Sequence, residues 1–150
     1  MINTMVTCLG SEHRKLNYTT VQLAFAAAAL ASDPGAVTAN QRALRVWEEI
    51  RHDPWSHLQI EDGLVHSWGE AHHAISGALL NTLKNERQEM RKLMGALRAL
   101  SSCPDRGPQT AGNRCSFAQT LLALARTLDS HVERYDEEVL PSILRALFHK

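Results

Sequence analysis

Residues 116–138, SFAQTLLALARTLDSHVERYDEE, decide the fold of this 150-residue chain. Apolar side chains recur along the stretch at alternating steps of three and four residues, which is the spacing of one face of an α-helix. Near its end the same face becomes polar, at His131 and Tyr135. A helix that only packed against other helices would carry leucine there, because a buried polar side chain costs free energy unless something compensates it. The stretch therefore predicts a helix that contributes to a polar site inside the protein.

Three earlier segments show the same helical period, and no segment alternates with the period of two that is typical of a strand. The links are the turn SDPG at residues 32–35, a short link near Gly69, and a loop rich in Pro and Gly at residues 101–115. Such links predict an all-α, up-down-up-down antiparallel four-helix bundle. Pro54 interrupts the second helix, so that helix is expected to be kinked or built in two pieces. The predicted helices cover residues 11–31, 38–68, 72–100 and 116–148.

The composition limits the possible classes of function. A length of 150 residues has room for one domain, which we expect to span residues 1–150. Hydrophobic residues make up 44% of the chain and charged residues 21%, with a formal net charge of +0. This balance gives no electrostatic reason to expect binding to nucleic acid or to an anionic membrane surface. No apolar run approaches the ~20 residues that cross a bilayer. We therefore predict neither nucleic acid nor a membrane as a partner, and the oligomeric state stays open.

The cysteines indicate a reducing compartment. Cys8, Cys103 and Cys115 form no disulfide framework and no CxxC pair. We interpret them as free thiols and predict a cytoplasmic protein, with a bridge between Cys103 and Cys115 left open as an alternative. The run VQLAFAAAALA at residues 21–31 imitates a signal peptide, but it continues the helical period that begins upstream at His13. We therefore interpret that run as part of a helix.

Polar residues interrupt the apolar face of every predicted helix at about the same depth. His57 and Glu61 are four residues apart, so one helix presents both to the same side. Because a helix rises ~1.5 Å per residue, residues equidistant from a turn lie at similar heights in antiparallel neighbours. By this measure His13 lies near the level of His57, and His131 near the level of Glu86. The sequence thus predicts one buried cluster.

The donor types in this cluster indicate a class of metal. Three imidazoles, one or two carboxylates and the phenol of Tyr135 make a mixed nitrogen and oxygen set without thiolate. Such a set suits iron, manganese or zinc and disfavours calcium or magnesium. Six or seven groups are more than a single zinc ion needs, since structural zinc takes four ligands. Two metal ions that share bridging carboxylates fit the set better.

Three motifs in the expected order resemble those of the haemerythrin-like proteins of the HHE cation-binding type. They are EHRKL at residues 12–16, HLQIED at residues 57–62 and HVERYDEEVLP at residues 131–141. The resemblance covers nearly the whole chain. It implies a four-helix bundle that holds two iron ions joined by an oxo or hydroxo bridge.

Two departures from the family pattern affect the site. In KNERQEM, residues 84–90, Arg87 stands where the family has a histidine, and arginine cannot ligate a metal. We expect the carboxylate of Glu86, on the predicted core face, to replace that imidazole. Tyr135 stands where the family has a second glutamate, and Asp136 follows at the position of the bridging aspartate in oxygen-carrying haemerythrins. Either Tyr135 ligates through its phenolate or Asp136 bridges; we favour Tyr135, whose position points further inward.

These residues lead to a functional hypothesis. Phenolate and carboxylate donors favour ferric iron and therefore disfavour reversible O₂ carriage. The set most resembles the haemerythrin-like proteins of mycobacteria, which implies catalase-like decomposition of H₂O₂, with Tyr135 as the catalytic residue. Alternatives are a protein that binds or senses O₂ or iron without catalysis, an iron store, and an interaction module without metal. The predicted metal ligands are His13, His57, Glu61, Glu86, His131, Tyr135 and Asp136.

Overall fold

The computed structural model describes residues 2–102 and 110–149, without the side chains of residues 2, 3, 5, 53–55 and 62. In these ranges every regular element is helical and no strand occurs. The first helix, α1, covers Ile2–Ser32 and begins well before the predicted residue 11. Cys103 lies outside the described residues, so its predicted state stays open, whereas Cys8 and Cys115 have free thiols.

The second predicted helix is built in pieces, as Pro54 indicated. It consists of α2 (Val37–Ile50), α3 (Asp53–Glu61) and the π-helical segment η1 (Asp62–Gly69). A turn at residues 51–52 separates α2 from α3. The break falls directly before a proline near the start of α3, where a missing backbone N–H costs no helical hydrogen bond.

The third and fourth predicted helices exist, but both begin elsewhere than expected. The third is α4 (Gly77–Ser101), which begins after Ser76 rather than at residue 72. The fourth is α5 (Ala111–Arg134), continued by the π-helical segment η2 (Tyr135–Val139) and by α6 (Leu140–Phe148). The hydroxyls of Ser76 and Thr110 accept hydrogen bonds from the backbone N–H groups of Leu79 and Asn113, at 3.2 and 3.1 Å. Such N-caps stabilise the first turn and explain where these two helices begin.

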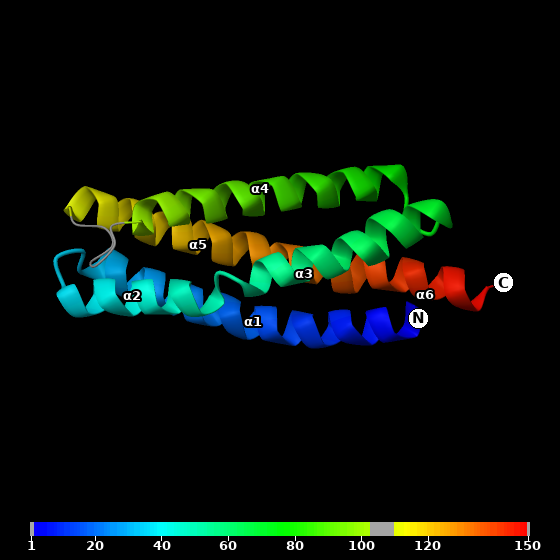
Figure 1. Cartoon of the computed structure of the whole chain (residues 1–150), viewed down its shortest axis with the longest axis horizontal. Coiled ribbons are helices and arrows are strands. Elements are labelled where there is room, and N and C mark those ends of the chain that lie inside the picture. Colours follow the sequence, from blue (N-terminus) through cyan, green and yellow to red (C-terminus); the bar gives the residue numbers. More distant parts are fainter. Residues whose placement is uncertain (1, 103–109, 150) are drawn as a thin grey trace.

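The helices run in alternate directions along one bundle, with the N- and C-terminal ends of the chain together (Figure 1). The first helix, α1, packs mainly against α5, while α4 covers another side of α5 and α2 returns along α1. This arrangement confirms the predicted all-α antiparallel bundle. Within the described ranges, none of the helices is both long enough and apolar enough to cross a membrane. The cytoplasmic location stays a prediction.

Buried apolar side chains form two clusters, one toward each end of the bundle. The larger cluster holds leucines from α1 and α5 together with residues of α2, α3 and α4. The smaller cluster lies nearer the chain ends and holds residues of α1, η1, α4, η2 and α6. Along α1, Leu16 belongs to the larger cluster and Leu9 to the smaller one, and His13 lies between them.

Along α3 and η1, along α4, and along α5 and η2, the buried apolar side chains also pass from one cluster to the other. Each of these passes has a buried polar residue at that level. We call this level the polar layer. Because leucine-rich packing covers it from both sides, its polar groups are removed from water and must find partners within the protein or with a bound ion. Its members are His13 on α1, His57 and Glu61 on α3, Arg87 on α4 and His131 on α5.

The inward face of α4 differs from the prediction by one residue at the polar layer. The sequence placed Glu86 on the core face, but the structure buries Arg87, which is 8% exposed, and leaves Glu86 at the flank. One residue along a helix turns the side chain by about 100°, since a turn holds 3.6 residues. The residues of α4 that are buried are Leu83, Arg87, Met90, Met94 and Leu97.

Candidate metal centre

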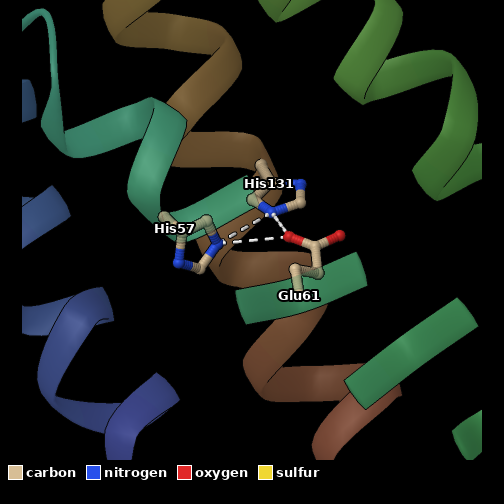
Figure 2. Close-up of side chains that lie close together, drawn as sticks. All are labelled: His57, Glu61 and His131. Carbon is tan, nitrogen blue, oxygen red and sulfur yellow. Dashed lines mark hydrogen bonds and ion pairs between the residues drawn. The ribbon is translucent and has the colours of Figure 1, made fainter. Parts of the chain in front are cut away.

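Three side chains of the polar layer converge in the middle of the bundle (Figure 2). Oε2 of Glu61 lies 2.7 Å from Nε2 of His131 and 3.2 Å from Nε2 of His57, and these two nitrogens are 3.3 Å apart. All three residues are fully buried. Because the three ligand atoms lie 2.7–3.3 Å from one another, a single metal ion with bonds of about 2.0–2.2 Å can reach all three.

Local helix geometry explains this convergence. His57 and Glu61 are one turn apart on α3, so their side chains lie on the same face. His131 stands on the buried face of α5, in phase with Leu124 and Leu128. The leucine period that builds the core therefore also carries the imidazole to the position opposite α3.

Two more predicted residues lie beside this trio. The ring centroid of His13 is 4.9 Å from that of His57 and 4.8 Å from that of Tyr135. Tyr135 is fully buried, and its ring centroid lies 6.1 Å from that of His131. The structure thus brings together donors from α1, α3, α5 and η2. We call them the inner donors: His13, His57, Glu61, His131 and Tyr135.

Several polar atoms of this group are buried without a hydrogen-bond partner among the described residues. They are Nε2 of His13, Nδ1 of His57, Oε1 of Glu61 and the hydroxyl of Tyr135. An unpaired buried polar group costs roughly 1–3 kcal/mol. Nitrogen, carboxylate and phenol atoms that lack a partner in one dry layer are the atoms that a bound metal ion would satisfy. The residues present therefore fit a metal.

Two predicted ligands, Asp136 and Glu86, lie behind histidines instead of among the inner donors. Oδ1 of Asp136 is 3.0 Å from Nδ1 of His13, and Oε2 of Glu86 is 3.0 Å from Nδ1 of His131. Asp136 has a side chain that is 53% exposed. In metal sites, a carboxylate on the outer ring nitrogen orients the imidazole and leaves the inner nitrogen to bind the ion. Direct ligation by either carboxylate stays a prediction, while their observed contacts are those of orienting groups.

Arg134 is a participant that the sequence analysis did not identify. Its Nε donates a 2.5 Å hydrogen bond to Glu86, and its Nη1 donates one of 3.1 Å to Glu138. The spacing of four residues between Arg134 and Glu138 was visible in the sequence as a helical ion pair. The contact to Glu86 was not visible, because it joins α5 to α4.

The charges of the centre are strongly coupled. Burial alone would raise the pKa of Glu61, but hydrogen bonds with His131 and His57 outweigh it and lower that pKa to about 2. Burial would lower the pKa of His131, but hydrogen bonds with Glu61 and Glu86 raise it to about 9. In the metal-free chain, a proton on His131 therefore balances the carboxylate of Glu61. A metal cation would take the place of that proton.

Burial favours the neutral forms of two more donors, His13 and Tyr135, in the metal-free chain. Burial lowers the pKa of His13, against the opposing hydrogen bond with Asp136, so its imidazole keeps a lone pair. Burial, with the charges of Glu61 and Asp136, raises the pKa of the Tyr135 phenol. A cation next to this phenol would favour its ionised form.

The helix α4 contributes a cation to the polar layer where the family pattern has a histidine. Burial lowers the pKa of the Arg87 guanidinium, and the nearby negative charge of Glu61 opposes that shift. The inner donors therefore come from three passes of the bundle, and α4 supplies Arg87 and the carboxylate of Glu86.

Comparison with known proteins agrees with this geometry. The family described as Hemerythrin HHE cation binding domain matches residues 3–143. No curated protein and no solved structure matches the chain, so the predicted likeness to the mycobacterial proteins stays a prediction. The match spans almost the whole bundle and includes every inner donor, and the chain belongs to the hemerythrin HHE cation-binding family.

Proposed function

We propose that this protein holds two iron ions in the polar layer and uses them to disproportionate hydrogen peroxide. The inner donors His13, His57, Glu61, His131 and Tyr135 would hold the metal, and Glu86 and Asp136 would orient two of the imidazoles. The observation that carries the proposal is the buried hydroxyl of Tyr135, which has no partner among the described residues and lies beside the histidine and glutamate donors. Phenolate is a hard anionic donor and favours ferric iron.

When bound, the iron would supply the electron transfer by which two H₂O₂ molecules become two H₂O and one O₂. The chain itself sets the surroundings of that reaction. Glu61, with its pKa held near 2, stays anionic and offsets the positive charge of the metal. The two apolar clusters exclude bulk water from the layer, which strengthens each charge interaction inside it. Five protein donors would leave coordination positions on two ions for a molecule as small as peroxide.

The proposal is tested first by metal content and gas evolution. Purified protein loaded with iron should contain about two iron atoms per chain and evolve O₂ when H₂O₂ is added, as followed with an oxygen electrode. His57→Gln and His131→Gln should bind less iron and evolve less O₂ per chain. A fully loaded sample that evolves no O₂ rules out the catalase-like reaction and leaves the metal site standing.

The role of Tyr135 is tested by spectroscopy. Iron loading should produce a visible phenolate-to-iron charge-transfer band in the wild type, and Tyr135→Phe should lose it. The chain has two tyrosines, and the other, Tyr18, is 69% exposed on α1, so Tyr18→Phe is a matched control that should keep the band. A band that persists in iron-loaded Tyr135→Phe would show that this residue is not a ligand.

A second candidate is binding or sensing of O₂ or iron without catalysis. Three imidazoles among the five inner donors favour it, since neutral nitrogen ligands also stabilise ferrous iron. The two candidates differ in one experiment. A carrier or sensor would show a spectrum that changes reversibly as O₂ is added to and removed from the reduced protein, without O₂ evolution from peroxide.

A further inference from the structure

A second concave site lies on the side of the polar layer away from the chain ends, beside the larger apolar cluster. It is a cavity of about 380 Å³ between the C-terminal part of α2, with the turn after it, and the later half of α4. Nε1 of Trp47 on α2 donates a 3.2 Å hydrogen bond to Oγ of Ser101 on α4, so the two helices are joined beside it. Its volume falls in the range of roughly 300–1,000 Å³ that is usual for small-molecule sites.

The wall of the cavity is basic. Three guanidinium groups line it, those of Arg51, Arg91 and Arg98, and His52 lies beside them. None of the described residues that line the cavity is acidic. Arg51 also contacts Glu48, at 3.1 Å. Guanidinium groups bind carboxylate and phosphate through paired hydrogen bonds.

The floor of the cavity is apolar. Trp47 and Met94 line it, and both belong to the larger apolar cluster. A ligand in this cavity would therefore meet charge at the rim and hydrocarbon at the floor. Sites of this composition favour molecules that have an anionic group and an apolar body over simple ions.

Gly95 is the feature that makes room for such a ligand. It lies inside the long helix α4, where glycine is less favourable than any residue except proline. No described atom lies within 4 Å of a Cβ placed on Gly95, so close packing does not require a glycine there. It stands four residues after Arg91 and three before Arg98, on the face that lines the cavity. A larger side chain at this position would fill the space between the two guanidinium groups.

We propose that this cavity binds a small organic anion, a carboxylate or phosphate carried by a compact apolar body. Arg91 and Arg98 hold the anionic group, and Trp47 and Met94 contact the body. The site is separate from the proposed peroxide chemistry and does not depend on it.

Calorimetric titration with four probes tests both halves of the proposal. The probes are 1-naphthoate, 1-naphthyl phosphate, the neutral 1-naphthalenemethanol and inorganic phosphate. At least one aromatic anion should bind at least tenfold more tightly than the neutral analogue and than inorganic phosphate. The two aromatic anions show whether the carboxylate or the phosphate is preferred. Equal binding of inorganic phosphate and the aromatic anions would overturn the proposal, because it would show a charge cluster without an apolar site.

Variants locate the binding. Arg91→Gln combined with Arg98→Gln should weaken it at least tenfold, in keeping with the loss of charged hydrogen bonds. Gly95→Leu should block it by filling the cavity, whereas Gly95→Ala should leave most of it. Arg126→Gln removes an exposed charge on α5, outside the cavity lining, and should bind as the wild type does. Unchanged binding in folded Gly95→Leu, as checked by circular dichroism, would overturn the assignment to this cavity.

Discussion

Two histidines of the candidate metal centre, His131 and His13, use their two ring nitrogens for different purposes. In His131, Nδ1 contacts Glu86 on the outside, and Nε2 faces Glu61 and His57 on the inside. In His13, Nδ1 contacts Asp136, and Nε2 is buried without a partner among the described residues. An outer contact fixes the direction of the ring, so the inner nitrogen is positioned before a metal binds.

The outer contact of His131 can be tested by removing the charge of its partner. Glu86→Gln keeps the size of the side chain but removes the anion that holds the imidazole. We expect metal affinity to fall by about tenfold or more, the usual effect of losing such an orienting group. Competition for Zn²⁺ with a chromophoric chelator measures this. Glu89→Gln, an exposed position on the same helix, is the control and should bind Zn²⁺ as the wild type does.

Replacing Tyr135 should weaken metal binding but should not destabilise the metal-free chain. Its hydroxyl is buried and no described residue pairs with it, so Tyr135→Phe removes an unsatisfied group and keeps the ring. Because such a group costs roughly 1–3 kcal/mol, the free energy of unfolding of the metal-free chain should stay equal or rise by about 1 kcal/mol. Urea denaturation in the presence of a chelator measures it. A clear loss of stability would mean that the hydroxyl has a partner in the metal-free protein.

At the scale of whole elements, two π-helical segments begin at two of the proposed ligands. Glu61 directly precedes η1, and Tyr135 is the first residue of η2. The fourth pass buries His131, Tyr135, Val139 and Ile143, which follow one another at steps of four. In a regular α-helix, three such steps would turn the last side chain about 120° away from the first. The wider turn of η2 keeps Tyr135 and the residues after it on the inward face, and such π segments are common at functional sites.

Gly95 allows a prediction about the intrinsic stability of α4. No described atom blocks a Cβ at this position, so Gly95→Ala meets no steric barrier. The alanine restricts the unfolded chain and favours the helix, which should raise the free energy of unfolding by about 1 kcal/mol. Urea denaturation of the two proteins measures the difference. Destabilisation would show that the backbone at Gly95 is packed more closely than the structure indicates.

The whole molecule places a charged layer between two apolar clusters, which makes the stability of the metal-free chain depend on pH. The pKa of His131 is raised from 6.5 to about 9, so its contribution is complete below pH 6.5 and is lost as pH rises through 9. The pKa of Glu61 is lowered from 4.5 to about 2, so its contribution is complete above pH 4.5 and is lost as pH falls toward 2. The pair therefore stabilises the fold most between pH 4.5 and pH 6.5.

This dependence is measured by urea denaturation of the metal-free chain at pH 6.5 and pH 9, the values that bound the titration of His131. The free energy of unfolding should fall over this range in the wild type. In His131→Gln the fall should be much smaller, and the difference between the two proteins isolates this imidazole from the other groups that titrate there. Equal falls in both proteins would contradict the raised pKa of His131.

The sequence alone predicted three features: the helical period, the spacing of four residues between His57 and Glu61, and the break of the second helix at Pro54. Each depends on the geometry of one helix, which is the same in every protein. The family motifs pointed to His13, His57, Glu61 and His131. The helical period placed Tyr135 on the same inward face, and the structure brings these five side chains together.

Only the tertiary structure decided how α4 faces the layer and what the outer carboxylates contact. The sequence placed Glu86 on the core face, but packing against α5 buries Arg87 and leaves Glu86 to contact His131 and Arg134. Likewise, Asp136 follows Tyr135 directly, yet it is half exposed and contacts α1 through His13. The rotation of a helix about its own axis depends on its neighbours, and a rotation of one residue exchanges an inner position for an outer one.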